Sequence, residues 1–440
     1  MKQTNWKVKV VLIALGAALC GGTAARAQSA DSLLDLLVRK GIITEKEMKD
    51  LKQEVDADMA RALARSNKLK LPKFLESLQL YGDARARFEY RNGERQGSDD
   101  DYDRNRWRLR VRLGLQGEYR ENFFYGIRLE TGSGSRSTNL TEGEGGPSAK
   151  GGNYAIQLGR LYLGWKPSDQ VTVVVGRQEI PFVTTSLVWD DDLNPEGFVE
   201  KLSWQSEKVD VFANLGQFIY ADFDENKFGG GGKEDVWMFG WQVGAKAKLP
   251  KDVTLTVAPT LYHYLNENNY SGNRFTGNGA NNTAINDLMV VEVPMEAAFK
   301  AGPVPVKIFG DVAINTRGAS RARANNDTAH NDQYWAYQAG LSLGASKKKG
   351  DWMLKAYWQH TELYALDPNL VDSDLFDARL NMEGFVVQGS YNFTDFLTGK
   401  VTYANAQDIN SALPTLTGAG DLKNDLHQYQ LWQADLSWKF

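Results

Sequence analysis

Apolar and charged residues alternate one by one between Arg104 and Tyr119, and this pattern constrains the fold more than any other feature. Every even position from Arg104 to Arg112 is an arginine, whereas the odd positions from Trp107 to Leu115 are all apolar. Successive side chains of a β-strand point to opposite faces, so this strand would carry one cationic and one apolar face. A helix would spread both sets around its circumference. The segment therefore predicts a strand with water on one side and an apolar medium on the other.

The same two-residue period returns in Trp237–Ala245, Trp352–Trp358 and Trp432–Phe440, and the breaks between such segments alternate in length. Short polar breaks fall near 120–122, 167–169, 205–208, 250–252, 301–303, 347–350 and 394–395. Longer loops fall near 91–103, 132–153, 179–197, 221–234, 265–286, 317–333, 365–381 and 407–426. These connections imply about sixteen strands. Short turns opposite long loops are typical of outer-membrane barrels, so we predict an all-β, antiparallel transmembrane β-barrel over residues 75–440.

The aromatic residues argue against a soluble sandwich or propeller, which would also alternate. The buried face of such a fold favours compact aliphatic side chains. Here the apolar parity carries large rings near the strand ends, at Tyr90, Trp107, Tyr119, Phe123, Trp165, Trp237, Trp352 and Trp438. These positions are expected of the aromatic girdles at the two membrane–water interfaces.

The composition removes several other classes of protein. A mean hydropathy of −0.45 is too low for a bundle of membrane helices. One cysteine and four scattered histidines argue against a disulfide framework and against zinc or histidine metal sites, so no metal or other cofactor is expected. No Gly-x-Ser-x-Gly motif occurs, and no catalytic residue is assigned because the histidines match no triad: His263, His330, His360 and His427.

The first residues have the three parts of a secretory signal. The apolar stretch from Val10 to Leu19 follows three lysines, Lys2, Lys7 and Lys9. Ala25-Arg26-Ala27 then supplies a small-x-small cleavage pattern, so residues 1–27 are expected to be a signal peptide. A lipoprotein anchored at Cys20 is the alternative, which the residues before that cysteine disfavour.

Residues 28–74 have the spacing of helices. Thr44 and Glu47 form a capping-box pattern. Apolar residues then recur three or four positions apart, at Met48, Leu51, Val55, Met59 and Leu63. We expect a helical periplasmic extension whose narrow apolar stripe needs a partner. A trimeric coiled coil and a loosely docked extension are both open.

Three stretches resemble known outer-membrane proteins. Gly176–Phe182 and Leu187–Gly197 resemble the putative porin family of Gram-negative bacteria, whose members carry a short helical N-terminus before the barrel. Leu436–Phe440 resembles the signal by which the barrel-assembly machinery recognises the C-terminal strand. More distantly, the chain is similar to phosphate-selective porins, which are trimers with an arginine ladder. The resemblance implies contact with outer-membrane lipids and, by analogy with sixteen-strand porins, a homotrimer, but it identifies no solute.

Nine arginines on the polar parity of the first four strands are the expected lining of the channel: Arg85, Arg87, Arg104, Arg106, Arg108, Arg110, Arg112, Arg128 and Arg160. An apolar wall would not tolerate so many unpaired guanidiniums, so water, carboxylates or passing anions must solvate them. Anion preference is one interpretation, since guanidinium suits phosphate and carboxylate groups. In the other, pairs such as Arg112 and Glu130, opposite each other across the 120–122 turn, brace the wall without selecting solutes.

The loop 179–197 is the best candidate for an inward-folded constriction, with an ordinary outer loop as the alternative. Its acidic run would face the basic wall and create a transverse field: Asp190, Asp191 and Asp192. The same loop suggests a calcium motif, but Pro195 stands where an EF-hand needs glycine, so no metal ligand is assigned.

These features together predict a porin in the outer membrane of a Gram-negative bacterium, for passive diffusion of small hydrophilic solutes with some anion preference. A structural or envelope-tethering barrel is one alternative. A sugar-type porin is another, and it would use lumenal aromatic residues at Tyr162, Phe212, Tyr262, Tyr264 and Tyr357. No nucleic-acid partner is expected.

Overall fold

The computed structural model describes residues 44, 48, 77–95, 101–119, 122–132, 137–143, 154–223, 233–270, 284–417, 420–422 and 425–440. From residue 77 onward they form a β-barrel within the second of two units of the chain, Phe74–Phe440. The predicted signal peptide (1–27) and helical extension (28–74) lie outside the described residues, apart from Thr44 and Met48.

One antiparallel sheet contains all the named strands: β1 (Gln79–Arg95), β2 (Asp101–Tyr119), β3 (Phe123–Thr131), β4 (Leu140–Thr141), β5 (Ile156–Ser168), β6 (Val171–Arg177), β7 (Glu196–Trp204), β8 (Val209–Ala221), β9 (Val236–Leu249), β10 (Val253–Val257), β11 (Thr260–Leu265), β12 (Met289–Ala301), β13 (Val304–Asn315), β14 (Trp335–Gly344), β15 (Trp352–Thr361), β16 (Met382–Asn392), β17 (Leu397–Asp408) and β18 (Leu426–Lys439). β4 is a two-residue strand beside β2. β10 and β11 are two halves of one strand, because both pair with β9 and β12. Counted in this way, the described residues form sixteen strands that make up the barrel wall, and the predicted barrel is confirmed.

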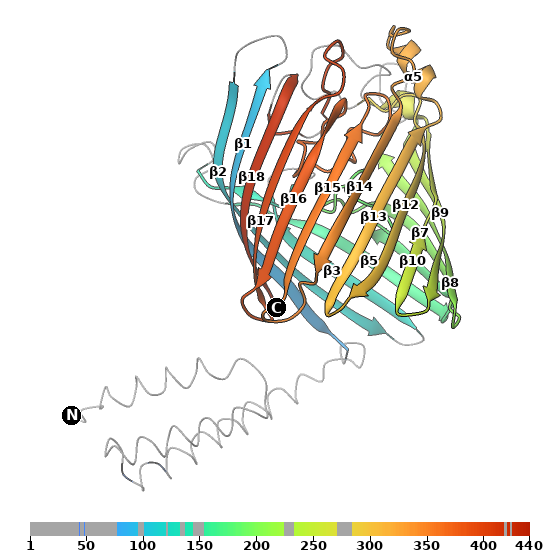
Figure 1. Cartoon of the computed structure of the whole chain (residues 1–440). Coiled ribbons are helices and arrows are strands. Elements are labelled where there is room, and N and C mark those ends of the chain that lie inside the picture. Colours follow the sequence, from blue (N-terminus) through green and yellow to red (C-terminus); the bar gives the residue numbers. More distant parts are fainter. Residues whose placement is uncertain are drawn as a thin grey trace, which may run out of the picture. The chain divides into compact units, whose positions relative to one another are not determined.

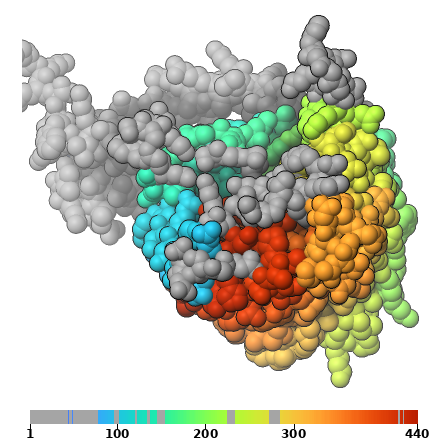
Figure 2. Space-filling view, turned by 90° about the horizontal axis from the view of Figure 1, so that it is seen from above, coloured from blue at the N-terminus to red at the C-terminus, as the bar shows by residue number. Residues whose placement is uncertain are grey.

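The sheet closes because its first strand pairs with its last. β1 lies between β2 and β18, and Ala86 faces Leu109 on one side and Leu436 on the other. Seen from above, the red C-terminal part lies beside the blue β1 and β2 (Figure 2). Every crossing strand then has two neighbours, so no sheet edge leaves backbone N–H and C=O groups unpaired in the membrane.

The short turns gather at one end of the barrel and the long loops at the other, as predicted (Figure 1). Where they are described, the loops contain two short helices that the sequence analysis did not predict, η2 (Glu267–Asn269) and α5 (Gly318–Ala324). Neither they nor any other helix among the described residues is long and apolar enough to span a membrane.

The break between β10 and β11 falls at Ala258 and Pro259 and was also not predicted. Proline has no N–H to donate to the ladder and is normally excluded from central strands. Its carbonyl still accepts a hydrogen bond from the Val243 N–H at 3.1 Å, and the Ala258 N–H donates to Pro294 O at 3.1 Å. The interruption therefore removes one backbone hydrogen-bond donor, but the strands on both sides of it stay connected to β9 and β12.

The outward face of the barrel is apolar and the inward face is buried. On β2, the Trp107 side chain is 58% exposed, whereas Arg106 and Arg108 are each 6% exposed. Exposed aromatic rings border the short-turn end, at Tyr119, Phe123, Trp165, Trp352, Phe396, Trp438 and Phe440. So large an outward apolar surface is unfavourable in water and stable against lipid.

We expect the folded barrel to keep its sheet in SDS at room temperature and to unfold only on boiling, because detergent meets an outer face that is already apolar and no free strand edge. Electrophoresis of boiled and unboiled samples, with circular dichroism in SDS, checks this. Equal mobility of the two samples together with loss of the β signal before heating would contradict it.

Candidate functional site

The nine predicted arginines lie on the inward faces of four neighbouring strands, β1, β2, β3 and β5. Six are buried, namely Arg85, Arg87, Arg106, Arg108, Arg110 and Arg128, and three are partly exposed, namely Arg104, Arg112 and Arg160. Arg91 of β1 shares this face and is 1% exposed. The sequence analysis missed it, although its position four residues after Arg87 has the right parity. We call these ten residues the arginine wall.

Carboxylates of neighbouring strands pair with many of these guanidiniums. Asp435 of β18 accepts two hydrogen bonds from Arg87, at 2.6 and 3.1 Å. Glu89 accepts one from Arg91 at 2.9 Å and one from Arg106 at 2.6 Å. Such pairs are stable only when both charges keep their partners, because an unpaired charge at this depth is costly.

Arg112 and Glu130 face each other across the turn between β2 and β3, as predicted from the sequence. Their ion pairs, however, are made with other residues. Arg112 Nε donates to Asp83 at 2.6 Å, and Glu130 pairs with Arg128 at 2.6 Å. The predicted strand register is therefore confirmed, and the predicted ion pair is wrong. Each residue has another partner: Asp83 lies on β1, on the other side of β2, and Arg128 lies two residues before Glu130 on β3.

The loop between β15 and β16 (362–381) brings further carboxylates to the arginine wall. Asp374 pairs with Arg87 at 2.8 Å, and Asp377 pairs with Arg91 at 2.6 Å. Burial alone would raise the pKa of Asp374, but the neighbouring guanidiniums, Arg87 foremost, hold it well below its ordinary value. Asp374 and Arg87 are 287 residues apart in the chain, so no local sequence signal could have joined them.

The loop between β17 and β18 (409–425) contributes in the same way. Asp421 pairs with Arg106, with Arg104 at 3.0 Å and with Arg91 at 3.2 Å. Burial favours a higher pKa for Asp421, but the charges of Arg91 and Arg106 and a hydrogen bond from Arg106 outweigh it and lower the pKa. The carboxylate is therefore charged at neutral pH and ties this loop to the wall.

Arg85 and Arg108 are the least compensated members of the arginine wall. Among the described residues, Arg85 has no ion-pair partner, and its Nη2 donates to Asn139 at 2.5 Å. Arg108 reaches Glu89 only at 3.7 Å and donates to Ser137 at 2.9 Å. The Nε atoms of both arginines are buried, with no acceptor in the part of the chain that is described. Positive charge therefore exceeds its local carboxylates at this point of the wall.

The loop between β6 and β7 (178–195) contains the predicted constriction segment and contacts strands far from its own ends. Val183 exchanges two backbone hydrogen bonds with the Gln242 side chain of β9, at 2.9 and 2.8 Å. Thr184 Oγ1 donates to Glu292 of β12 at 2.6 Å. Thr185 Oγ1 donates to Asp311 of β13 at 2.6 Å. Because Glu292 and Asp311 are inward and fully buried, this part of the loop lies inside the barrel.

Apolar contacts hold the same loop in place. Leu187 is 0% exposed and Trp189 is 2% exposed. The Trp189 and Phe182 rings both pack on Tyr262 of β11, with centroid distances of 6.1 and 5.5 Å. Buried aromatic groups of this size each remove a large apolar area from water, so the loop has one preferred position.

The three predicted acidic residues of this loop have different surroundings. Asp190 is buried and accepts two hydrogen bonds from Ser373, at 3.1 Å from its N–H and 2.7 Å from its hydroxyl. Asp192 approaches Arg110 and Arg112 at 3.6 and 3.7 Å. Asp191 is exposed. The described residues include no group of three or more His, Cys, Asp or Glu side chains arranged to hold a metal ion.

Among models of known protein families, the one described as putative porin matches residues 94–292. The predicted resemblance to this family is confirmed. No curated relative matches the sequence.

Solved porin structures resemble the barrel at low identity. They include an anion-selective porin from Comamonas acidovorans (12% identity, 83% of this chain and 99% of that chain covered, TM-score 0.46). Others are OmpF of Salmonella typhi in complex with daunomycin (10%, 82% and 97%, 0.46) and OmpT of Vibrio cholerae (11%, 84% and 100%, 0.42). These likenesses are weak, and the strand pairing of the chain itself establishes the fold.

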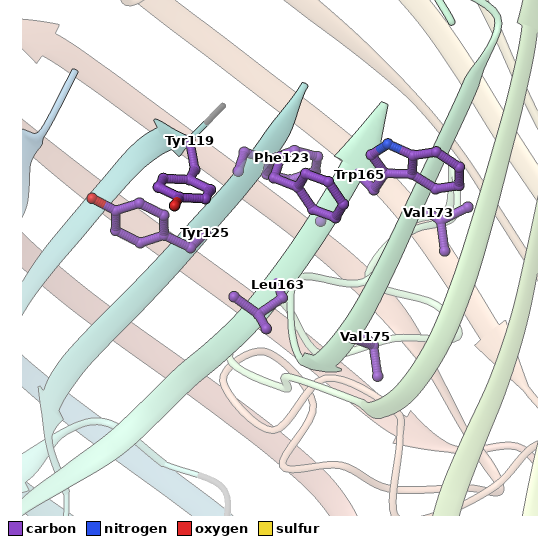
Figure 3. Close-up of a pocket in the computed structure, with 9 residues that line it drawn as sticks. Tyr119, Phe123, Tyr125, Leu163, Trp165, Val173 and Val175 are labelled. Atoms are coloured by element: carbon purple, nitrogen blue, oxygen red, sulfur yellow. The ribbon is translucent and has the colours of Figure 1, made fainter. Parts of the chain in front are cut away.

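The outer wall of the barrel carries an apolar groove of about 720 Å³. Tyr119, Phe123 and Trp165 line its aromatic side near the short turns, and Leu163 and Val175 lie along the neighbouring strands (Figure 3). These side chains belong to the membrane-facing parity and are exposed there. The groove is therefore a surface for apolar groups and not part of the lumen.

Replacing both loop hydroxyls, as in Thr184→Val with Thr185→Val, should loosen the loop between β6 and β7. The buried carboxyl groups of Glu292 and Asp311 would each lose a donor, at about 1–3 kcal/mol per group. We expect larger current fluctuations in planar bilayers than for the unmodified protein. Thr184→Ser with Thr185→Ser keeps both hydroxyls and is the matched control; equal fluctuations in the two variants would refute this anchoring role.

Proposed function

We propose that this chain is an outer-membrane porin through which small hydrophilic solutes diffuse, with a preference for anions. The observation that carries the proposal is the arginine wall, which lines the inside of a barrel whose outside is apolar. The family match supports the general function, a porin. Guanidinium groups keep their charge across the physiological pH range, so the preference would not depend on pH there.

The carboxylates of the wall and loops set the expected strength of that preference. Asp83, Glu89 and Asp435 neutralise much of the wall and brace it, which is the second interpretation drawn from the sequence. Arg85 and Arg108 are incompletely paired among the described residues and would leave an excess of positive charge. Because salt screens exposed charges beyond about 10 Å at 0.1 M, this excess would act on ions only close to the wall. We therefore propose a moderate rather than strict preference for anions.

The loop between β6 and β7 is proposed as the constriction. Its contacts with Gln242, Glu292 and Asp311 support this, since they hold it across the interior. Asp191 and Asp192 on the loop, opposite basic side chains of the wall, would produce a transverse field at this level. A polar solute whose charges match that field would pass more readily than an apolar one of equal size.

A sealed structural barrel is the second candidate function. It is favoured by the apolar cluster inside the barrel, where Leu187 and Trp189 pack with Leu363 and Leu366 of the loop between β15 and β16. A sugar-type porin has less support. Tyr262 and Tyr264 are 2% exposed, and their hydroxyls donate to Glu292 and Asp367, so they offer no aromatic surface to a passing solute.

The proposed assembly follows from the sequence. Residues 1–27 would direct export, the C-terminal strand would be recognised by the barrel-assembly machinery, and the mature barrel would lie in the lipids of a Gram-negative outer membrane. We propose a homotrimer by analogy with other sixteen-strand porins. The helical segment 28–74, as a coiled coil, would be one means of association.

Single-channel recording in a salt gradient tests the proposal. We expect a steady conductance with greater permeability to chloride than to potassium. Arg106→Ala with Arg108→Ala and Arg110→Ala should lower this ratio, because the substitutions remove three positive charges and leave carboxylates such as Glu89 with fewer cationic partners. Absence of any steady current would favour the sealed barrel, and unchanged reversal potentials in a folded triple variant would remove the anion preference.

A further inference from the structure

Two lysines extend the positive surface of the lumen beyond the arginine wall. Lys355 of β15 is on the inward face, two residues from the buried Tyr357, and Lys400 of β17 is on the inward face, two residues from the buried Thr402. In the sheet, Lys400 is paired with Asp435 of β18. Asp435 is in turn paired with Arg87 of β1, so the lysines and the first strand lie on one side of the barrel.

Neither lysine is well neutralised. Lys400 lies 3.5 Å from Asp435, but that carboxylate already accepts both short hydrogen bonds of Arg87. Lys355 has no carboxylate within 4.0 Å among the described residues. Its ammonium lies over the rings of Phe309 and Tyr357, 5.0 Å from each centroid. A ring face orients a cation without cancelling its charge.

Arg85 completes this group. It is 9% exposed, has no ion-pair partner among the described residues, and its buried Nε has no acceptor there. It pairs with Ser437 of β18, which pairs with Thr398 of β17, two residues from Lys400. Apart from Arg108, the remaining arginines that were predicted as channel lining make most of their hydrogen bonds or ion pairs with carboxylates. Arg106, for example, is shared between Glu89 and Asp421.

The loop between β6 and β7 lies near the two lysines. Asp191, its exposed carboxylate, interacts with both Lys355 and Lys400. The lysines therefore border the space next to the tip of the proposed constriction.

We propose that Arg85, Lys355 and Lys400 form an oxyanion-binding site in the lumen, for groups such as phosphate or carboxylate. This proposal deepens the proposed porin function and rests on it. Arg85 has a planar guanidinium fork, whose geometry suits two oxygens of an oxyanion. The two lysines add compact positive charge. The incomplete neutralisation makes the site attractive to an anion, and the neighbouring Asp191 and Asp435 keep it weak enough to release one.

Block of chloride current by inorganic phosphate tests the site in the full-length porin. We expect saturable block of the unmodified channel. Arg85→Gln with Lys355→Gln and Lys400→Gln should raise the half-blocking phosphate concentration about tenfold or more, as expected for lost charge-assisted hydrogen bonds.

A charge-matched control comes from the other side of the barrel. Lys201→Gln with Lys246→Gln and Lys248→Gln removes three positive charges from β7 and β9, and should change the block less than about twofold because screening limits charge effects at a distance. Equal weakening in both triple variants would mean a general field and overturn the site. Failure of phosphate to block an anion-preferring channel would also overturn it while leaving the proposed function intact. A cation preference of the unmodified channel would instead overturn the proposed function.

A second variant keeps the test valid if loss of the buried Arg85 prevents folding. Lys355→Gln with Lys400→Gln leaves Arg85 in place and should still raise the half-blocking concentration severalfold. Arg85→Lys keeps the charge and loses the fork, so it should weaken block. Unchanged block in both of these folded variants would overturn the proposal.

Discussion

Closure of the sheet between β1 and β18 is the constraint on which the rest of the structure depends. It pairs the backbone of every crossing strand and so allows the chain to present apolar side chains to lipid without a free edge. It also fixes the register of β1 against two neighbours at once. With that register set, alternation along each strand decides which residues face the lumen, and Arg87 is brought beside Asp435.

The interior is held together by charge pairs between distant parts of the chain. Asp374 and Asp421 come from two different outer loops and reach arginines of β1 and β2. Each pair has little net value by itself, but removal of one partner leaves an uncompensated charge in a buried place. The loops are therefore fixed to the wall, and the charge that stays available to solutes is what remains after this pairing. The distribution of carboxylates, more than the number of arginines, would determine selectivity.

Much of the fold could be predicted from the sequence because the two-residue period is a local property. The alternation around Trp107 and the spacing of turns gave the strand number, and the register of Arg112 against Glu130 followed from the position of one turn. The ion pairs could not be predicted in this way. Arg112 bonds Asp83 on the preceding strand, and Arg87 bonds a loop residue 287 positions away. Such contacts depend on how loops fold into a closed space, for which the sequence has no period.

Thiol accessibility along β2 tests the central claim most directly, that the arginine parity meets water and the tryptophan parity meets lipid. The sequence has a single cysteine, Cys20, inside the predicted signal peptide, so introduced thiols can be read without interference. In membranes, the Arg112→Cys variant should react with a charged, water-soluble thiol reagent, and the Val111→Cys variant should react only with a lipid-soluble one. The reverse pattern, or equal reactivity of the two variants, would contradict the account.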